Sequence, residues 1–230
     1  MNKYELVKKI EDIAPLETAE NWDLSGWIVD NGKNEIRKIM LCLTLTPDII
    51  RQAQNSECDM IISHHPLFFV PLEFNCGINM YCAHTNLDKA PNGTTETLIK
   101  TLRFKQDEFQ PHEYLRFCTL SSEILFSALI DKLKTVSNNI RYTGNLTCSR
   151  IKKIAFCSGS GTEFWPEAKE FGADVFVTGD LKFHTAHDTT IPIIDIGHFE
   201  SEIPVLNTLK QILGVEEILL ADETSPIIRM

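Results

Sequence analysis

The chain has 230 residues, enough to bury a substantial core as one domain or as two small ones. Hydrophobic residues make up 43% of it and charged residues 23%, which excludes the disordered, collagen-like and coiled-coil classes. The formal net charge is -10 and no lysine or arginine cluster offsets it, so the composition disfavours nucleic acid and anionic lipid as partners.

The sequence carries no sign of export or of membrane insertion. The first residues, MNKYELVKKIEDIAP, have no apolar core of signal-peptide length, and no run reaches about 18 apolar residues. The seven cysteines include no CxxC pair, which indicates reduced, buried thiols rather than a disulfide framework. We therefore expect a soluble, cytoplasmic protein without a membrane partner.

Hydrophobic periodicity predicts an alternation of helices and strands along the chain. The segment 103–120 has no clear pattern. The predicted elements, in chain order, are a helix over 2–13, a strand, helix and strand over 36–68, a helix over 94–102, a helix over 121–134, a second strand, helix and strand over 151–183, and a helix over 203–213 that ends at Gly214.

The two strand, helix, strand segments are copies of one another. They align without a gap at an offset of 115 residues, with seven identities in 33 positions, where roughly two are expected by chance. Near-continuous apolar strands that alternate with amphipathic helices imply mainly parallel sheets covered by helices. We predict an α/β fold, a single compact unit made of two intertwined, internally duplicated lobes at roughly 1–115 and 116–230.

Polar residues end the second strand of each copy. The first copy ends on His64 and His65, and the second ends on Asp180. Downstream of each strand a histidine precedes a carboxylate by four residues: His84 and Asp88, His198 and Glu202. Because ligands of open α/β sheets collect beyond the carboxyl ends of strands, the repeat predicts one site between the lobes, built from both halves.

The clustered side chains have the chemistry of a transition-metal site. Imidazoles with carboxylates suit Zn, Mn, Fe, Co or Ni better than Mg or Ca. Since consecutive strand residues point to opposite sides, His64 and His65 are expected to bind different ions. Two ions about 3.5–4 Å apart activate water, so the pattern predicts hydrolysis. Asp180 and His184 are candidate general acids or bases or ligand-orienting groups, with a structural aspartate and a surface histidine as the alternative.

Five stretches resemble a known family. AENWDLSGW, SHHPLFF, AHTNLDKAPNG, TGDLKFH and GHFESE are similar to the signature blocks of the Nif-three-like family, often labelled GTP cyclohydrolase I type 2 homologues. The resemblance implies two intertwined α/β lobes, two divalent transition-metal ions per chain, and a homo-oligomer in the form of a hexameric ring.

The resemblance also implies a role for each metal ligand. His64 and His198 match the ligands of one ion, His65 and Asp88 match those of the other, and Glu202 matches the carboxylate that bridges them. The first block departs from the family pattern Trp-Asp-Asn-x-Gly, because this chain reads WDLSG. We interpret the tryptophan of this block, Trp22, as a packing residue.

Two functions stay open. The first is a dinuclear metal-dependent hydrolase whose small-molecule substrate is a nucleotide or another phosphorylated compound, with GTP ring opening as the activity that the family label suggests. The loop Ser158–Thr162 is rich in glycine but lacks the lysine of a phosphate-binding P-loop. The second is a non-catalytic metal-binding protein, a regulator or adaptor that forms a ring.

Overall fold

The structure is a computed structural model that describes residues 1–67, 76–104, 109–144, 146 and 149–227. The chain forms two compact units: unit 1 comprises Met1–Gly93 and Val205–Thr224, and unit 2 comprises Thr94–Pro204 and Ser225–Met230. The chain thus leaves unit 1, builds unit 2 and returns. The first crossing falls after Gly93 and not near residue 115, because helix α4 (Thr94–Thr101) packs on elements of unit 2.

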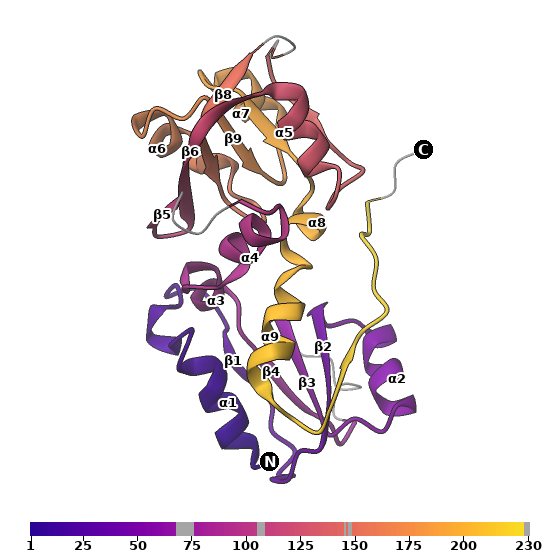
Figure 1. Cartoon of the computed structure of the whole chain (residues 1–230). Helices are drawn as coiled ribbons and strands as arrows, with labels where there is room; N and C mark the ends of the chain where they lie inside the picture. The colour runs from indigo at the N-terminus through magenta and orange to yellow at the C-terminus, as the bar shows by residue number, and fades with distance from the viewer. Residues whose placement is uncertain (68–75, 105–108, 145, 147–148, 228–230) are drawn as a thin grey trace. The chain divides into compact units, whose positions relative to one another are not determined.

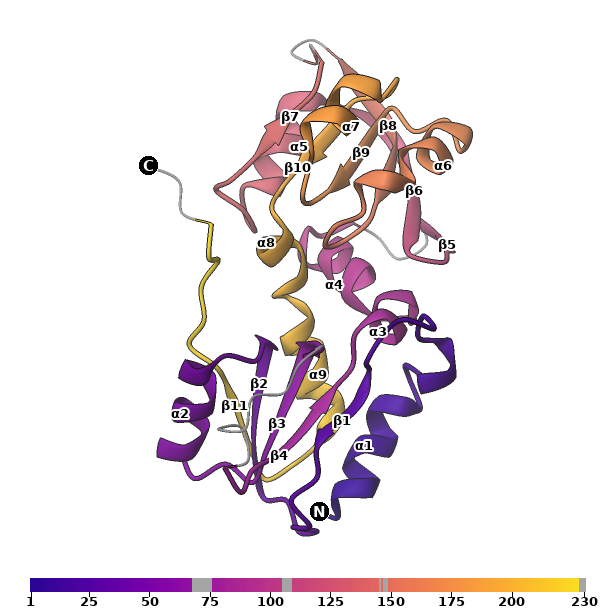
Figure 2. The same cartoon turned by 180° about the vertical axis from the view of Figure 1, so that it is seen from behind.

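Unit 1 is built on a five-stranded sheet with the order β1-β4-β3-β2-β11. The sheet is mainly parallel, with β1 antiparallel to β4. Helix α2 covers one face, and α1 and α9 lie on the other (Figures 1 and 2). The bounds are α1 (Lys3–Glu11), η1 (Leu16–Thr18), β1 (Gly26–Val29), β2 (Lys38–Thr44), α2 (Pro47–Asn55), β3 (Met60–His65), β4 (Asn79–Cys82), α3 (Thr85–Lys89), α9 (Val205–Leu213) and β11 (Glu217–Leu220).

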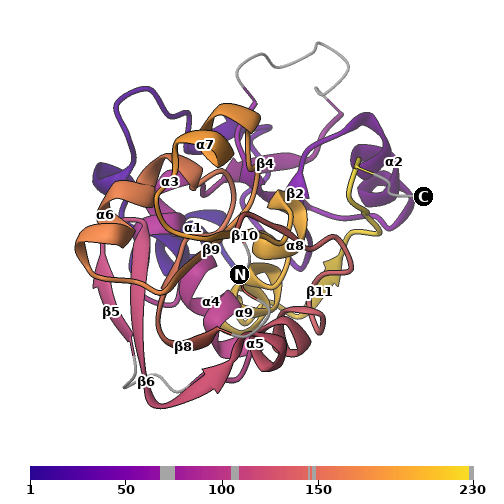
Figure 3. The same cartoon turned by 90° about the horizontal axis from the view of Figure 1, so that it is seen from above.

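Unit 2 is built on a six-stranded sheet with the order β5-β6-β8-β9-β10-β7. This sheet is mixed: β8, β9 and β10 are parallel, and the other pairings are antiparallel. Its faces are covered by α4 and α5 on one side and by α6 on the other (Figure 3). Besides α4, the bounds are β5 (Phe109–His112), β6 (Leu115–Leu125), α5 (Phe126–Leu133), β7 (Arg141–Tyr142), β8 (Arg150–Phe156), η4 (Thr162–Phe164), α6 (Trp165–Glu170), β9 (Val175–Thr178), α7 (Phe183–Asp188), β10 (Ile193–Asp195) and α8 (His198–Glu202).

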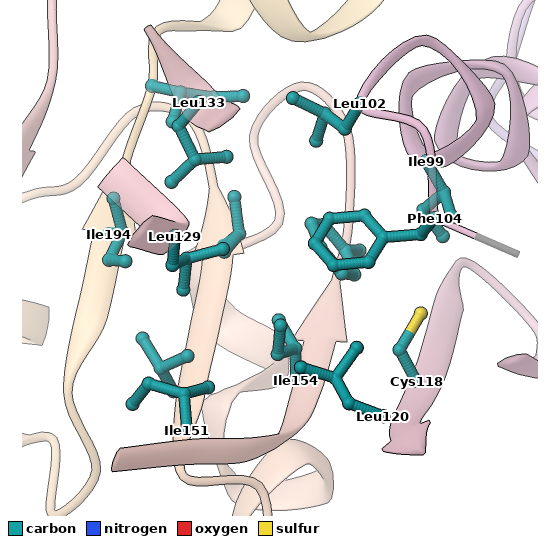
Figure 4. Packing of buried hydrophobic residues seen from close by; sticks show 14 of the residues in the cluster. Ile99, Leu102, Phe104, Cys118, Leu120, Leu129, Leu133, Ile151, Ile154 and Ile194 are labelled. Atoms are coloured by element: carbon teal, nitrogen blue, oxygen red, sulfur yellow. The ribbon is translucent and has the colours of Figure 1, made fainter. Parts of the chain in front are cut away.

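The core of unit 2 shows why apolar periodicity predicts this fold. Leu129 and Leu133 of α5 pack over Ile151 and Ile154 of β8, and Phe104 packs beside them (Figure 4). All of these side chains are buried. The helices and strands therefore share one apolar layer, which favours their association by the hydrophobic effect.

The register of the strands supports the internal duplication. In unit 1, Ile39 of β2 pairs with Met60 of β3. In unit 2, Ile154 of β8 pairs with Val175 of β9, and both residues lie 115 positions later. The first two strands of the two copies therefore pair in the same register as well as aligning in sequence.

One identity of the repeat has a structural reason. Asp59 accepts hydrogen bonds from the backbone N–H groups of Arg37 (2.7 Å) and Lys38 (3.1 Å), at the start of β2. Asp174 accepts hydrogen bonds from the backbone N–H groups of Lys152 and Lys153, at 2.8 Å each, within β8. Each aspartate directly precedes the second strand of its repeat copy, β3 or β9, so its carboxylate links the beginning of that strand to the neighbouring strand.

The predicted helix over 121–134 is wrong in its first five residues. Strand β6 continues to Leu125, and helix α5 begins only at Phe126. Ile124 and Leu125 pair with Ile151 and Arg150 of β8, beyond an irregularity in the β6 register. The sequence Ser-Ser-Glu before an apolar run is typical of a helix start, but pairing with β8 outweighs this local preference.

The helix ends follow local sequence signals. Thr46 caps α2 by accepting a hydrogen bond from the N–H of Ile49 (3.2 Å), and Pro47 occupies the first turn. Gly214, with φ +60°, follows the last residue of α9, as its predicted role as a helix end requires. No helix in the described part of the chain has both the length and the apolar composition needed to cross a bilayer.

We predict that Asp59→Asn lowers the free energy of unfolding by about 1–3 kcal/mol, because two charge-assisted hydrogen bonds from the backbone to a buried carboxylate are weakened. Asp174→Asn is the matched variant, and it should cost less because Asp174 is exposed while Asp59 is 5% exposed. Urea denaturation followed by circular dichroism measures both changes. An equal loss in the two variants would contradict the assignment of the effect to burial.

The pH dependence should follow the same contact. Burial opposes the charged form of Asp59, but hydrogen bonds from Lys33, Arg37 and Lys38 outweigh it and lower the pKa. A lowered pKa means that the stabilisation is present above the pKa of an unfolded aspartate, about 3.9, and is lost as the pH falls through the folded value. The difference between the parent and Asp59→Asn should therefore shrink in acid.

Candidate metal centre

Two neighbouring histidines end strand β3 in unit 1. His64 is fully buried, and its Nδ1 lies 2.9 Å from the carbonyl oxygen of Ala83. Because a carbonyl only accepts, Nδ1 carries the proton, and Nε2 is the nitrogen that can ligate a metal. The Nε2 atom of His64 lies 3.5 Å from Oδ1 of Asp88, on helix α3.

His65 is oriented by the neighbouring strand. Its Nδ1 lies 2.7 Å from the hydroxyl oxygen of Thr44, at the end of β2. The backbone N–H groups of Leu43 (2.6 Å) and Thr44 (3.4 Å) donate to the carboxylate of Glu223, which fixes the end of the same strand. The support of His65 therefore includes a residue from the C-terminal segment of the chain.

His84 completes a cluster of three imidazoles in unit 1. Its ring centre lies 5.2 Å from that of His64 and 5.8 Å from that of His65, and each of the three offers a nitrogen within 4.8 Å of the others. His84 lies two residues beyond the end of β4, and its Nδ1 lies 2.9 Å from Oδ1 of Asp23. We call His64, His65, His84 and Asp88 the first half-site.

Asp23 organises the first half-site from a distant part of the sequence. Its carboxylate contacts the ring of His84, and accepts hydrogen bonds from Thr85 and Ser25. Burial raises the pKa of this carboxyl, but the hydrogen bonds from Thr85, His84 and Ser25 outweigh burial and lower it to about 2. Asp23 is therefore a fixed negative charge behind the ring of His84.

The rings of His64 and His65 lie close together, and the expectation that they bind different ions stays a prediction. The centres of their rings lie 4.9 Å apart, with the planes tilted by 44°. Alternation fixes the directions of the Cα–Cβ bonds, but imidazoles at the end of a strand reach beyond it and can approach one another. The geometry is compatible with one ion between them or with two neighbouring ions.

The second predicted cluster lies in unit 2, around His198 at the start of α8. Nδ1 of His198 lies 2.7 Å from Oδ2 of Asp180, and Nε2 lies 3.1 Å from Oε2 of Glu202. Burial lowers the pKa of His198, but the hydrogen bonds to Asp180 and Glu202 prevail and raise it to about 10. This arrangement of Asp180, His198 and Glu202, which we call the second half-site, favours a cation.

Asp195 aligns the two loops that carry the second half-site. Its carboxylate accepts hydrogen bonds from the N–H of Leu181 (3.0 Å), next to Asp180, and from the N–H of Gly197 (2.8 Å), next to His198. The side chain of Arg141 donates to the same carboxylate from β7 (2.8 Å). Asp195 is 2% exposed, so these bonds form where water competes little.

Glycine lets the backbone approach Glu202. Gly159 has φ +68°, and a Cβ atom at this position would overlap Oε1 of Glu202. Its N–H donates to the hydroxyl of Ser201 (2.8 Å), which fixes the loop against helix α8. The glycine-rich loop Ser158–Thr162 therefore cradles the buried carboxylate of Glu202, which is 4% exposed.

The predicted site residues are distributed unevenly. Of the five predicted metal ligands, His64, His65 and Asp88 belong to the first half-site, and His198 and Glu202 to the second. Asp180 holds His198, as a ligand-orienting residue would. His184 is exposed on α7, and its ring contacts that of Phe183, with centres 5.6 Å apart.

Sequence reasoning missed three residues that shape the first half-site. The repeat contains His84 but does not single it out as a ligand, and the sequence assigns no site role to Thr44 or to Asp23 of the WDLSG block. The spacing of His84 and Asp88, which mirrors that of His198 and Glu202, was the available signal for His84. Trp22 was interpreted as a packing residue, but its side chain is 60% exposed.

The donor set fits a transition metal. In each of the four histidines of the half-sites, Nδ1 lies next to an oxygen atom. The oxygens belong to the carbonyl of Ala83, the hydroxyl of Thr44 and the carboxylates of Asp23 and Asp180, and this is the environment of histidine ligands in metal sites. Nitrogen and carboxylate donors together suit Zn, Mn, Fe, Co or Ni. The fold and these two half-sites define an internally duplicated α/β protein with histidine and carboxylate groups that could hold a metal ion.

Comparisons with known proteins assign the chain to a family. The Duf34/NIF3 (NGG1p interacting factor 3) family matches residues 1–225, and the chain belongs to this family. A relative from Clostridium perfringens, named GTP cyclohydrolase 1 type 2 homolog, is 34% identical over 90% of this chain and 88% of its own.

Solved structures support the fold. A Staphylococcus aureus hypothetical protein is similar with a TM-score of 0.85 and 22% identity, over 100% of this chain and 99% of that one. Reduced HcgD from Methanocaldococcus jannaschii is similar with a TM-score of 0.82 and 25% identity, over 97% and 98% of the two chains. The mixed α/β architecture with two sheets covered by helices is thus the fold of this family.

We predict that Asp23→Asn weakens Zn²⁺ binding by roughly ten- to a hundredfold, since it removes the charge that orients His84. Competition with a chromophoric chelator measures the affinity. Asp30→Asn is the control, because Asp30 accepts from Lys3 in the same unit and contacts none of the half-site residues. An unchanged affinity in Asp23→Asn would show that His84 does not contribute to metal binding.

A second prediction concerns the loop under Glu202. Gly159→Ala should displace Glu202 and reduce Zn²⁺ affinity by at least about tenfold, comparable to the loss of a residue that supports a ligand. Gly172→Ala is the matched control, because Gly172 has φ +79° but a Cβ there would meet only Lys153 Nζ, at 3.7 Å. Both variants should lose similar stability from backbone strain. Equal Zn²⁺ affinity in the two variants would refute the role of the loop Ser158–Thr162 in positioning Glu202.

Proposed function

We propose that the two half-sites together hold a dinuclear transition-metal centre of a hydrolase. His64, His65, Asp88, His198 and Glu202 would be the ligands, with His84 as an additional candidate. The observation that carries the proposal is the orientation of the histidines, each with Nδ1 against an oxygen. Divalent ions at these residues would supply Lewis-acid activation of water and neutralise negative charge on the substrate.

The residues around the ligands have defined roles in this proposal. Asp180 keeps the proton of His198 on Nδ1, so that Nε2 is the nitrogen that would ligate the metal ion. Glu202 lies next to that nitrogen, and its neighbour Gly159 leaves space for its carboxylate. When no ion is bound, the proton on His198 Nε2 provides the positive charge that the two carboxylates favour.

The family and the charge of the site support one substrate class. A relative carries the name GTP cyclohydrolase 1 type 2 homolog, which supports a nucleotide or another phosphorylated small molecule. The chain has a net charge of -10, so an anionic substrate needs bound cations to approach the carboxylates. We propose ring opening of GTP as the first reaction to test.

The same geometry also suits a non-catalytic metal-binding regulator or adaptor. The observation in its favour is that His184, the candidate general acid or base, is exposed, and Asp180 is engaged by His198. The proposed hexameric ring would serve this function as well as catalysis. Light scattering of the purified protein measures the mass of the assembly.

We predict about two transition-metal ions per chain, measured by elemental analysis of protein purified without chelators. His64→Ala and Glu202→Ala should each lose one or both ions, because each removes a ligand. His112→Ala is the matched control for a histidine outside the half-sites. If the variants keep the parent's metal content, the proposed centre is wrong.

Turnover separates the two functions. The hydrolase should release formate from GTP, or phosphate from a panel of nucleotides and phosphoesters, and Glu202→Ala should abolish the release with the assembly intact. Full metal occupancy with no turnover across the panel would favour the adaptor.

A further inference from the structure

Trp22 is exposed at a place where the surrounding loop is well fixed. Its side chain is 60% exposed, the highest value among the aromatic residues described in unit 1. Among the described residues, Trp22 makes a ring contact with His84. The ring centres lie 6.2 Å apart and the ring planes meet at 74°. Most of the indole surface is thus open beside the first half-site.

The backbone on both sides of Trp22 is tied to helix α3. On one side, the N–H of Glu20 donates to Thr85 (3.0 Å), and the side chain of Glu20 pairs with Lys89 (2.6 Å). On the other side, Asp23 binds Thr85 through its carboxylate. The backbone that carries the indole is therefore ordered before any ligand binds, which lowers the entropic cost of binding.

The position of the indole limits what it can bind. Its neighbour His84 is part of the imidazole cluster, so a flat ring stacked on Trp22 lies next to the candidate ligands. Leu24, 47% exposed on the same loop, adds apolar surface. An exposed indole face favours a planar aromatic ring over a phosphate, because π-stacking requires a second π-face.

We infer that Trp22 is a stacking platform for the planar heterocycle of the substrate, and that the site recognises nucleotides through their base. This inference rests on the proposed function for the site, since it places the base on Trp22 and the anionic part toward the cations. It makes Trp22 a specificity-determining residue. A sugar phosphate would bind the cations through its phosphate but has no base to stack on Trp22.

The test compares GMP with ribose 5-phosphate, which differ by the base. Trp27→Phe combined with Trp165→Phe leaves Trp22 as the single tryptophan, because the chain has three. In this Zn²⁺-loaded variant GMP should quench the fluorescence, and ribose 5-phosphate should not. In the otherwise native protein, Trp22→Ala should weaken GMP binding by roughly ten- to a hundredfold in calorimetry, which corresponds to one lost base stack. Trp22→Phe should retain most of the affinity.

Several outcomes would overturn the inference. GMP, AMP, UMP and flavin mononucleotide could all fail to quench Trp22 at millimolar concentration. Trp22→Ala could weaken the binding of GMP and of ribose 5-phosphate by the same factor, which would indicate general damage to the site. Trp22→Ala could also change the mass of the assembly, which would assign the indole to a contact between copies of the chain.

Failure of the hydrolase proposal has a different signature. Quenching by GMP measures binding and does not require turnover. Base-dependent quenching without any product release would support the platform and count against the enzyme. Turnover of GTP that is unchanged in Trp22→Ala would support the enzyme and overturn the platform.

Discussion

The hydrogen bond at Nδ1 of each histidine is the interaction on which the site depends. An imidazole can rotate and change tautomer, so a histidine at a strand end does not by itself present a defined nitrogen. Carbonyl and carboxylate oxygens fix both the ring and the tautomer at His64, His84 and His198, and the Thr44 hydroxyl fixes the ring orientation of His65. Because these partners lie on neighbouring strands and loops, the sheet geometry determines where each Nε2 points.

The internal duplication gave the two units the same scaffold but different chemistry. His65 and Asp180 occupy equivalent positions of the repeat, yet His65 lies in the imidazole cluster, while Asp180 contacts the ring of His198. Asp180 also has φ +55°, which aspartate tolerates better than most residues. The role of holding the downstream histidine falls in unit 1 to Asp23, which lies outside the repeat.

The sequence predicts the parts of this architecture that repeat or alternate. Apolar periodicity predicts the strand, helix, strand units. Asp59 and Asp174, which the repeat aligns, have the same structural role. Local sequence patterns predict structure less well where strand pairing determines it. Ser121–Leu125 resembles a helix start but extends β6, because its end pairs with β8. Exposure is the weakest inference from sequence: an apolar residue such as Trp22 suggests packing, but its position on a polar turn leaves it in solvent.

Long-range support is what sequence patterns cannot reveal. Asp23 reaches His84 across 61 positions, and Glu223 reaches Leu43 across 180, so no local spacing connects either pair. The second contact depends on the return of the chain, because β11 pairs with β2 and places Glu223 at the end of that strand. Thr44 lies at the same strand end and contacts His65. The orientation of a candidate metal ligand in the first half of the chain is therefore completed only when its last strand has folded.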